Sequence, residues 1–116
     1  MAIGVAICAD ISNPIHPADA AGHGAKVYAA GVAKTPREIG DAAASMAAHA
    51  KKHRMLAVMA NYASSTGGHP TDGSSAVWDE TGELAARAEP QGEYIVLAQR
   101  TPEGWAGRVV RLSHAQ

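Results

Sequence analysis

The chemistry open to this sequence depends first on its one cysteine. Cys8 ends an apolar run over residues 2–8, and a turn-forming stretch from Asp10 to Pro14 follows it. Ligands collect at the carboxyl ends of the strands in α/β sheets, so a thiol here favours a site. A thiol close to the start of a helix is more often the nucleophilic thiolate, and the backbone N–H of Ala9 would be able to hold a developing oxyanion. The alternative is a structural role, since free cysteine is among the most buried residue types.

Histidines offer a second kind of chemistry. His49 and His53 lie four positions apart on a predicted helix, a spacing that lets two imidazoles hold one metal ion. Ala50 stands where zinc proteases carry their glutamate, and no third ligand is near in sequence. A solvated helix end is therefore the favoured interpretation, and we expect no metal. Three further histidines offer a cysteine–histidine pair with Cys8, which spacing alone does not establish: His16, His23 and His69.

Parallel strands would carry Cys8 to one edge of a sheet. Three apolar runs of strand length alternate with two helical segments, which predicts parallel pairing through right-handed crossovers. We expect the strands, covered on both faces, over residues 2–8, 26–33 and 55–62, and the helices over residues 17–23 and 36–54. Thr35, Pro36 and Glu38 match a capping box at the start of the second helix.

The second part of the chain has a different pattern. A polar, glycine-rich loop over residues 64–73 precedes short strands predicted at residues 74–79, 83–89, 93–101 and 105–112. The chain therefore predicts one α/β domain with a mixed sheet and helices on one face. Its parts are a β-α-β-α-β unit (residues 1–63), the loop (64–73), and antiparallel strands with a tail (74–116).

Composition limits the classes of function. The 116 residues are 47% hydrophobic with a formal net charge of −1, which gives no electrostatic argument for nucleic acid or a membrane surface. No apolar run approaches the roughly 20 residues that span a bilayer, and the first residues lack a signal-peptide pattern. A single cysteine fits a reducing compartment, so we expect a cytoplasmic protein.

Four motifs, in order along the chain, resemble the nitrilase or carbon–nitrogen hydrolase superfamily. Residues 4–14 (GVAICADISNP) are similar to the segment around its catalytic cysteine, with an acidic residue two positions later and proline soon after. The others are residues 22–25 (GHGA), 60–61 (AN) and 73–83 (GSSAVWDETGE). The resemblance runs from about Ile3 to Ala98 and implies the C-terminal half of a four-layer α-β-β-α sandwich.

The resemblance also implies an activity and roles. Cys8 would be the nucleophile that attacks a small non-peptide amide or nitrile, without a cofactor, and Ala9 would supply the oxyanion N–H. Asp10 would hold the bend by accepting backbone hydrogen bonds, with an ordinary ion pair as the alternative. Asn61 would line or brace the pocket, or only satisfy strand ends, and Ser75 would support a hairpin.

The sequence departs from the family in two respects. Ala9 stands where many members carry an aromatic residue after the cysteine. Family enzymes use a glutamate as general base and a lysine as stabiliser, both tens of residues before the cysteine, whereas seven residues precede Cys8. A half of this fold would leave one apolar sheet face open, which predicts a homodimer or a complex with a chain that carries the N-terminal half. The competing interpretation is an inactive relative that serves as a binding or oligomerising domain.

Overall fold

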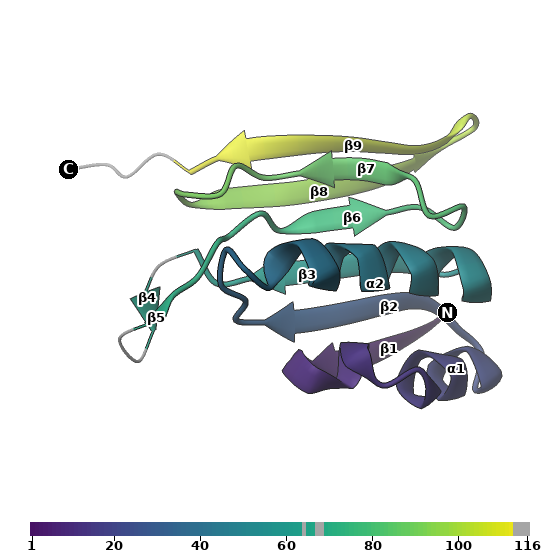
Figure 1. Ribbon diagram of the computed structural model, residues 1–116. Coiled ribbons are helices and arrows are strands. Elements are labelled where there is room, and N and C mark those ends of the chain that lie inside the picture. Colours follow the sequence, from purple (N-terminus) through teal and green to yellow (C-terminus); the bar gives the residue numbers. More distant parts are fainter. Residues whose placement is uncertain (64, 67–68, 113–116) are drawn as a thin grey trace.

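A five-stranded mixed sheet with helices on one face forms the protein, as the sequence predicts (Figure 1). The structure is a computed structural model that describes residues 1–63, 65–66 and 69–112. The strand order is β1-β2-β3-β6-β7, with the first three strands parallel and the last two antiparallel. These strands are β1 Ala2–Ile7, β2 Ala25–Val32, β3 Leu56–Asn61, β6 Ala76–Trp78 and β7 Leu84–Arg87.

Three helices connect the parallel strands. They are the 3-10 helix η1 (Cys8–Ser12), α1 (Ile15–Gly22) and α2 (Ile39–His53). The expected capping interaction at residues 35–38 is present in part, because the Glu38 carboxylate accepts the Thr35 N–H at 3.0 Å. That bond and a second from the Thr35 hydroxyl keep the pKa of Glu38 below its ordinary value. Helix α2 ends at Arg54, which has the left-handed backbone that glycine usually supplies.

The core lies between the sheet and helices α1 and α2. Tyr28, Met46, Met55 and Met59 are fully buried there. Helix α1 approaches β1 closely at Gly4, where an added Cβ would lie 2.8 Å from the Cβ of Ala20. Small residues at such contacts allow the backbones to come together, which suits this alanine-rich sequence.

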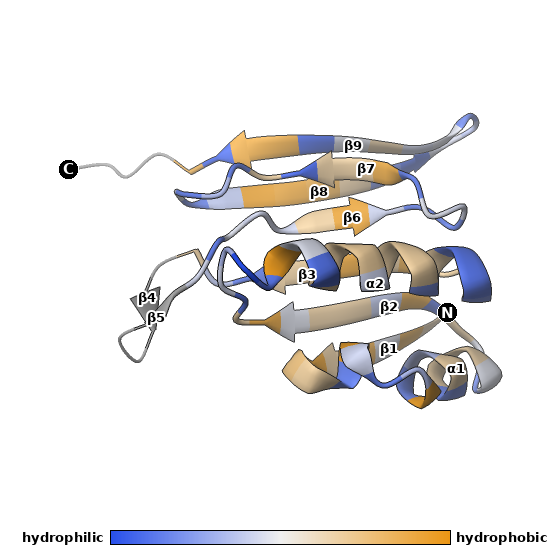
Figure 2. Cartoon of the chain, in the orientation of Figure 1, coloured by the Kyte–Doolittle hydropathy of each residue, from blue (hydrophilic) through white to orange (hydrophobic). Residues whose placement is uncertain are grey.

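The opposite face of the sheet is covered only in part. The hairpin of β8 (Tyr94–Thr101) and β9 (Gly104–Arg111) packs against β6 and β7, where Gly107 contacts the Ala85 backbone. No described element covers β1 on this face, and Ile3, Val5 and Ile7 are between 56% and 70% exposed. The strands carry mostly white to orange colours in Figure 2, and blue gathers at the turns. The prediction that the first strand is covered on both faces is therefore wrong, because β1 is an edge strand with helices on one face only.

The prediction of an irregular loop at residues 64–73 also needs adjustment. The segment at residues 64–73 contains two short strands, β4 (Ser65–Thr66) and β5 (His69–Pro70), while Ser64 and residues 67–68 lie outside the described residues, as does the end of the predicted tail, residues 113–116. Within the described part of the chain, no helix is both long and apolar enough to cross a membrane.

The turn between β6 and β7 is organised by Asp79. One oxygen of its carboxylate accepts hydrogen bonds from the Thr81 hydroxyl (2.6 Å), the Thr81 N–H (2.9 Å) and the Glu83 N–H (3.1 Å). Partial burial raises the pKa of Asp79, but these bonds outweigh it and keep the pKa below 3.8. The same turn packs on α2, because an added Cβ at Gly82 would lie 3.0 Å from the Ala47 carbonyl oxygen.

We predict that Asp79→Ala lowers the free energy of unfolding at neutral pH by about 1–3 kcal/mol, because three hydrogen bonds are lost. A carboxyl whose pKa is lower in the folded state stabilises above its unfolded value of 3.8, and this stabilisation disappears as the pH falls through the folded value. Urea titrations of both proteins across pH should therefore converge in acid. A constant difference down to about pH 2 would contradict this assignment.

Candidate active site

Cys8 lies at the point where β1 ends and η1 begins. It is exposed, and its φ of 48° places a non-glycine residue in the left-handed region. That conformation costs on the order of 1 kcal/mol, and such outliers cluster at functional sites. The thiol is thus presented at the surface and not buried as a structural cysteine would be.

The Asp10 side chain, in η1, stabilises the bend at Cys8. Its Oδ2 accepts the N–H of Ile7 at 2.9 Å, and the backbone carbonyl of Asp10 accepts the N–H of Asn13 at 3.1 Å. The same carboxylate oxygen lies 3.4 Å from Nε2 of His16. Asp10 therefore accepts a backbone hydrogen bond and also has the His16 imidazole as a neighbour.

An open, shallow depression adjoins Cys8. Its lining comes from the carboxyl ends of β2 and β3 and the residues that follow: Gly31, Val32, Ala33, Ala60, Asn61 and Tyr62. The parallel register places Ile7 of β1 beside Gly31, and Gly31 beside Ala60, at this edge. Small side chains at these positions leave room beside the thiol. The topology thus brings the predicted nucleophile and Asn61 to one rim of the sheet.

Asn61 braces the loops around the depression. It is 7% exposed, its Oδ1 accepts the Lys34 N–H at 2.7 Å, and its Nδ2 donates to the carbonyls of Lys34 (3.2 Å) and Gly73 (2.8 Å). Its own N–H donates to the Ser75 hydroxyl at 2.9 Å. One side chain therefore joins the loop after β2 to the segment before β6. Ser75, which directly precedes β6, contacts the Asn61 backbone.

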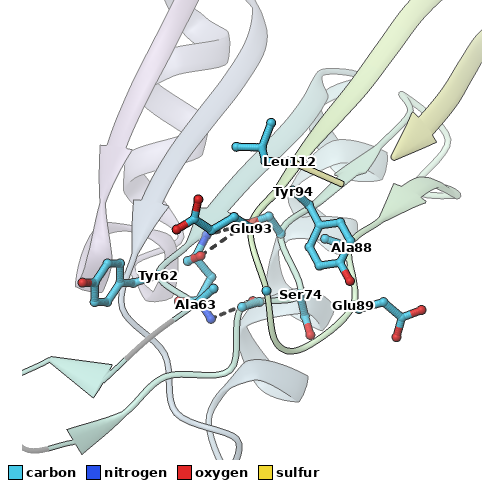
Figure 3. Close-up of a pocket in the computed structure, with 12 residues that line it drawn as sticks. Tyr62, Ala63, Ser74, Ala88, Glu89, Glu93, Tyr94 and Leu112 are labelled. Carbon is cyan, nitrogen blue, oxygen red and sulfur yellow. Dashed lines mark hydrogen bonds between the residues drawn. The ribbon is translucent and has the colours of Figure 1, made fainter. Parts of the chain in front are cut away.

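A deeper cavity of about 370 Å³ shares Asn61 and Tyr62 with the depression (Figure 3). Its other walls come from residues far apart in the sequence: Ala63, Gly73, Ser74, Ser75, Ala88, Glu89, Gly92, Glu93, Tyr94 and Leu112. Tyr62, Glu89 and Tyr94 were not singled out from the sequence. Tyr62 could have been found from the sequence, because it directly follows a buried strand. Tyr94 could not, because it reaches the cavity only through the packing of the β8–β9 hairpin on the sheet.

The histidines take structural contacts. Nε2 of His49 lies 2.7 Å from the Ile11 carbonyl oxygen, which joins α2 to η1, and Nδ1 of His23 lies 2.8 Å from the Asp19 carbonyl oxygen. The expectation of a solvated helix end is wrong for His49, because its packing on η1 half-buries it. Burial, with Lys52 and His49 nearby, lowers the pKa of His53.

No group of three or more potential metal ligands occurs among residues 1–63, 65–66 and 69–112. The side chain of His69 lies outside what the structure describes. His16 contacts Asp10 and Tyr28, so its link to the bend is through the carboxylate.

The family model "Carbon-nitrogen hydrolase" matches residues 1–107 of this sequence. The chain belongs to this family. The resemblance drawn from the four motifs is therefore confirmed at the level of a carbon–nitrogen hydrolase fragment.

Solved structures of carbon–nitrogen hydrolases have the same fold. The chain is similar to a mutant amidase from Nesterenkonia sp. AN1 that carries the acetamide moiety of fluoroacetamide on its active-site cysteine (TM-score 0.73, 21% identity, 95% of this chain and 37% of that chain). It is also similar to Nit3 of Saccharomyces cerevisiae, a member of branch 10 of the nitrilase superfamily (TM-score 0.74, 18% identity, 94% and 37%). A carbon–nitrogen hydrolase from Helicobacter pylori G27 matches at TM-score 0.70 with 20% identity over 78% and 37%. The chain thus spans about 37% of the length of these proteins.

We predict that Asn61→Ala lowers the free energy of unfolding by about 2–4 kcal/mol, because the part-buried Lys34 N–H and the buried Gly73 carbonyl lose the partner that Asn61 supplies. Asn13→Ala is the matched control, since its exposed side chain accepts only the Ile15 N–H, at 3.1 Å, and its loss should cost about 1 kcal/mol or less. Urea denaturation measures both. Equal losses in the two variants would show that Asn61 is not the brace described here.

Proposed function

We propose that this chain is the nucleophile-bearing part of a carbon–nitrogen hydrolase that acts on a small non-peptide amide or nitrile. It would correspond to the C-terminal half of the nitrilase fold. The observation that carries the proposal is the geometry of Cys8, exposed at the carboxyl edge of the parallel strands in a left-handed bend and beside an open depression. A packing cysteine needs none of these features.

The proposed reaction proceeds through a thioester. For an amide, the Cys8 thiolate attacks the carbonyl carbon and the oxygen becomes an oxyanion, which the Ala9 N–H stabilises. The C–N bond then breaks, and the nitrogen leaves with a proton as ammonia or an amine. Water hydrolyses the thioester, which releases the carboxylic acid and restores the thiol.

Other groups complete this mechanism. By the family pattern, a glutamate moves the protons and a lysine stabilises the developing charge. We propose that both come from outside the 116 residues described by this sequence, in the part of the fold that covers the open face. No metal or organic cofactor has a role in the proposed steps.

The relatives support the class of substrate. The Nesterenkonia amidase carries a covalent acetamide moiety on its active-site cysteine in one structure, and another mutant of it is in complex with butyramide. Small aliphatic amides are therefore the first substrates to test. The open depression that Cys8 itself lines has a volume of about 510 Å³, which accommodates a molecule of this size.

A single-cysteine chain makes the nucleophile easy to test. We predict that iodoacetamide alkylates Cys8 at about pH 6 at least roughly tenfold faster than free cysteine, because an activated thiol is more often thiolate. Intact mass measures the rate, and Cys8→Ser, which should gain no mass, shows that labelling is confined to the thiol. Butyramide hydrolysis is then assayed with and without a chain that carries the N-terminal half of a relative. A rate equal to that of free cysteine, also in the presence of the N-terminal-half chain, would overturn the proposal.

A second candidate is an inactive relative that binds or oligomerises. The exposed apolar side chains of Ile3, Val5 and Ile7 favour it, because soluble proteins rarely leave such a face open. Under either function we propose that a second sheet covers this face, from another copy of the chain or from an N-terminal-half chain.

The simplest partner is a second copy. We predict that the chain sediments as a dimer at micromolar concentration and that Val5→Lys makes it monomeric, because a charge would be buried in the interface. Ile15→Lys is the control, since Ile15 is 63% exposed but lies on α1, in the helical layer. A monomeric wild type that binds no hydrophobic dye would contradict a covered face, whereas dye binding by a monomer would favour a different chain as the partner.

A further inference from the structure

A contact network that begins at the buried Tyr28 ends at the bend that presents Cys8. Nδ1 of His16 lies 2.7 Å from the hydroxyl oxygen of Tyr28, and Nε2 of His16 lies 3.4 Å from Oδ2 of Asp10. That Oδ2 also accepts the Ile7 N–H, immediately before Cys8. The three side chains come from β2, α1 and η1, and so they connect the core of the domain to the residue in the left-handed conformation.

Tyr28 is the end of this network that lies in the core, and its ring is packed on two sides. Tyr28 has no exposed surface, and its ring packs edge-on against the rings of both His16 and His49, with centroids 5.7 Å and 6.0 Å apart. Burial, with a smaller effect from the Asp10 charge, raises the pKa of Tyr28 to about 12. The phenol therefore keeps its proton at neutral pH and can donate it.

This proton determines the arrangement at His16. If the Tyr28 hydroxyl donates to Nδ1, a neutral imidazole carries its own proton on Nε2, which is the nitrogen that faces the Asp10 carboxylate. In this tautomer His16 accepts from the buried phenol, and its Nε2–H lies on the side of the Asp10 carboxylate, 3.4 Å from Oδ2. The titratable groups around the ring are Asp10 from η1, Tyr28 from β2 and, behind Tyr28, His49 from α2; β1 contributes none.

We propose that His16 is a positioning residue for Cys8. It holds the Asp10 carboxylate against the Ile7 N–H and so keeps the cysteine in its exposed, left-handed conformation. The role in catalysis rests on the proposed function, whereas the effect on the bend does not. His49 supports the same 3-10 helix separately, through the Ile11 carbonyl.

The test compares variants of the full chain. His16→Ala should slow iodoacetamide alkylation of Cys8 by about five- to tenfold and speed hydrogen exchange of the Ile7 amide by a similar factor, because one charge-assisted contact is lost. His16→Gln should restore most of both, since its amide can accept from the Tyr28 hydroxyl and donate to Asp10. His23→Ala is the matched control, because His23 follows the same helix and contacts the Asp19 carbonyl.

Two further variants show whether His16 acts through Asp10. On an Asp10→Asn background, His16→Ala should have little additional effect on either rate, which a residue that only stabilises the helix would not produce. Tyr28→Phe keeps the ring but removes the donated proton, so it should reproduce part of the His16→Ala effect even if His16→Ala folds poorly.

The outcomes separate the two proposals. Equal alkylation and Ile7 exchange in His16→Ala and His23→Ala would overturn the positioning role, as would full additivity with Asp10→Asn. Failure of the proposed function would be seen in the wild type, as a Cys8 no more reactive than free cysteine even when the N-terminal-half chain is present. Ile7 exchange does not depend on thiol chemistry, so it still tests the role of His16 in that case.

Discussion

The left-handed backbone at Cys8 is the constraint on which the candidate site depends. A side chain at this φ is disfavoured, so the rest of the fold must offset the cost. The Asp10 carboxylate does so locally by accepting the Ile7 N–H, and the burial of Ile11, which is 1% exposed, anchors the same short helix to the core. Without these contacts, a chain that continued from β1 in extended conformation would carry the thiol away from the rim.

The parallel order of β1, β2 and β3 supplies the surroundings of that bend. Because all three strands end at one edge, the loops that follow them meet there, and the Asn61 side chain ties two such loops together. The antiparallel strands lie on the other side of β3 from β1 and β2. They extend the sheet at β6 and β7, and their continuation, the β8–β9 hairpin, forms a wall of the neighbouring cavity.

The sequence predicted much of the fold, because its apolar runs and its helix-start signals are local. The observed strands β1, β2 and β3 lie within a residue or so of the predicted ones, and Cys8 was placed correctly at a strand end. Other features could not be predicted. Arg54 ends α2 in a conformation usual for glycine, and the contact between His16 and Asp10 exists only because α1 packs on β2. The uncovered face of β1 was expected from the family resemblance but not from the apolar run, which is typical of a strand covered on both sides.

The exposed edge and apolar face of β1 affect the solubility of the protein during its synthesis. Strand β1, which leads to the thiol, lies at one edge of the sheet. Its unpaired backbone groups and exposed apolar side chains are what a nascent chain would use to associate with neighbouring chains. The second sheet that we propose covers this face would then have to be present in an equal amount while the chain is made. Its presence would determine how much soluble protein is obtained. Without a covering surface, Cys8 would lie at the end of an edge strand, where local opening is easiest.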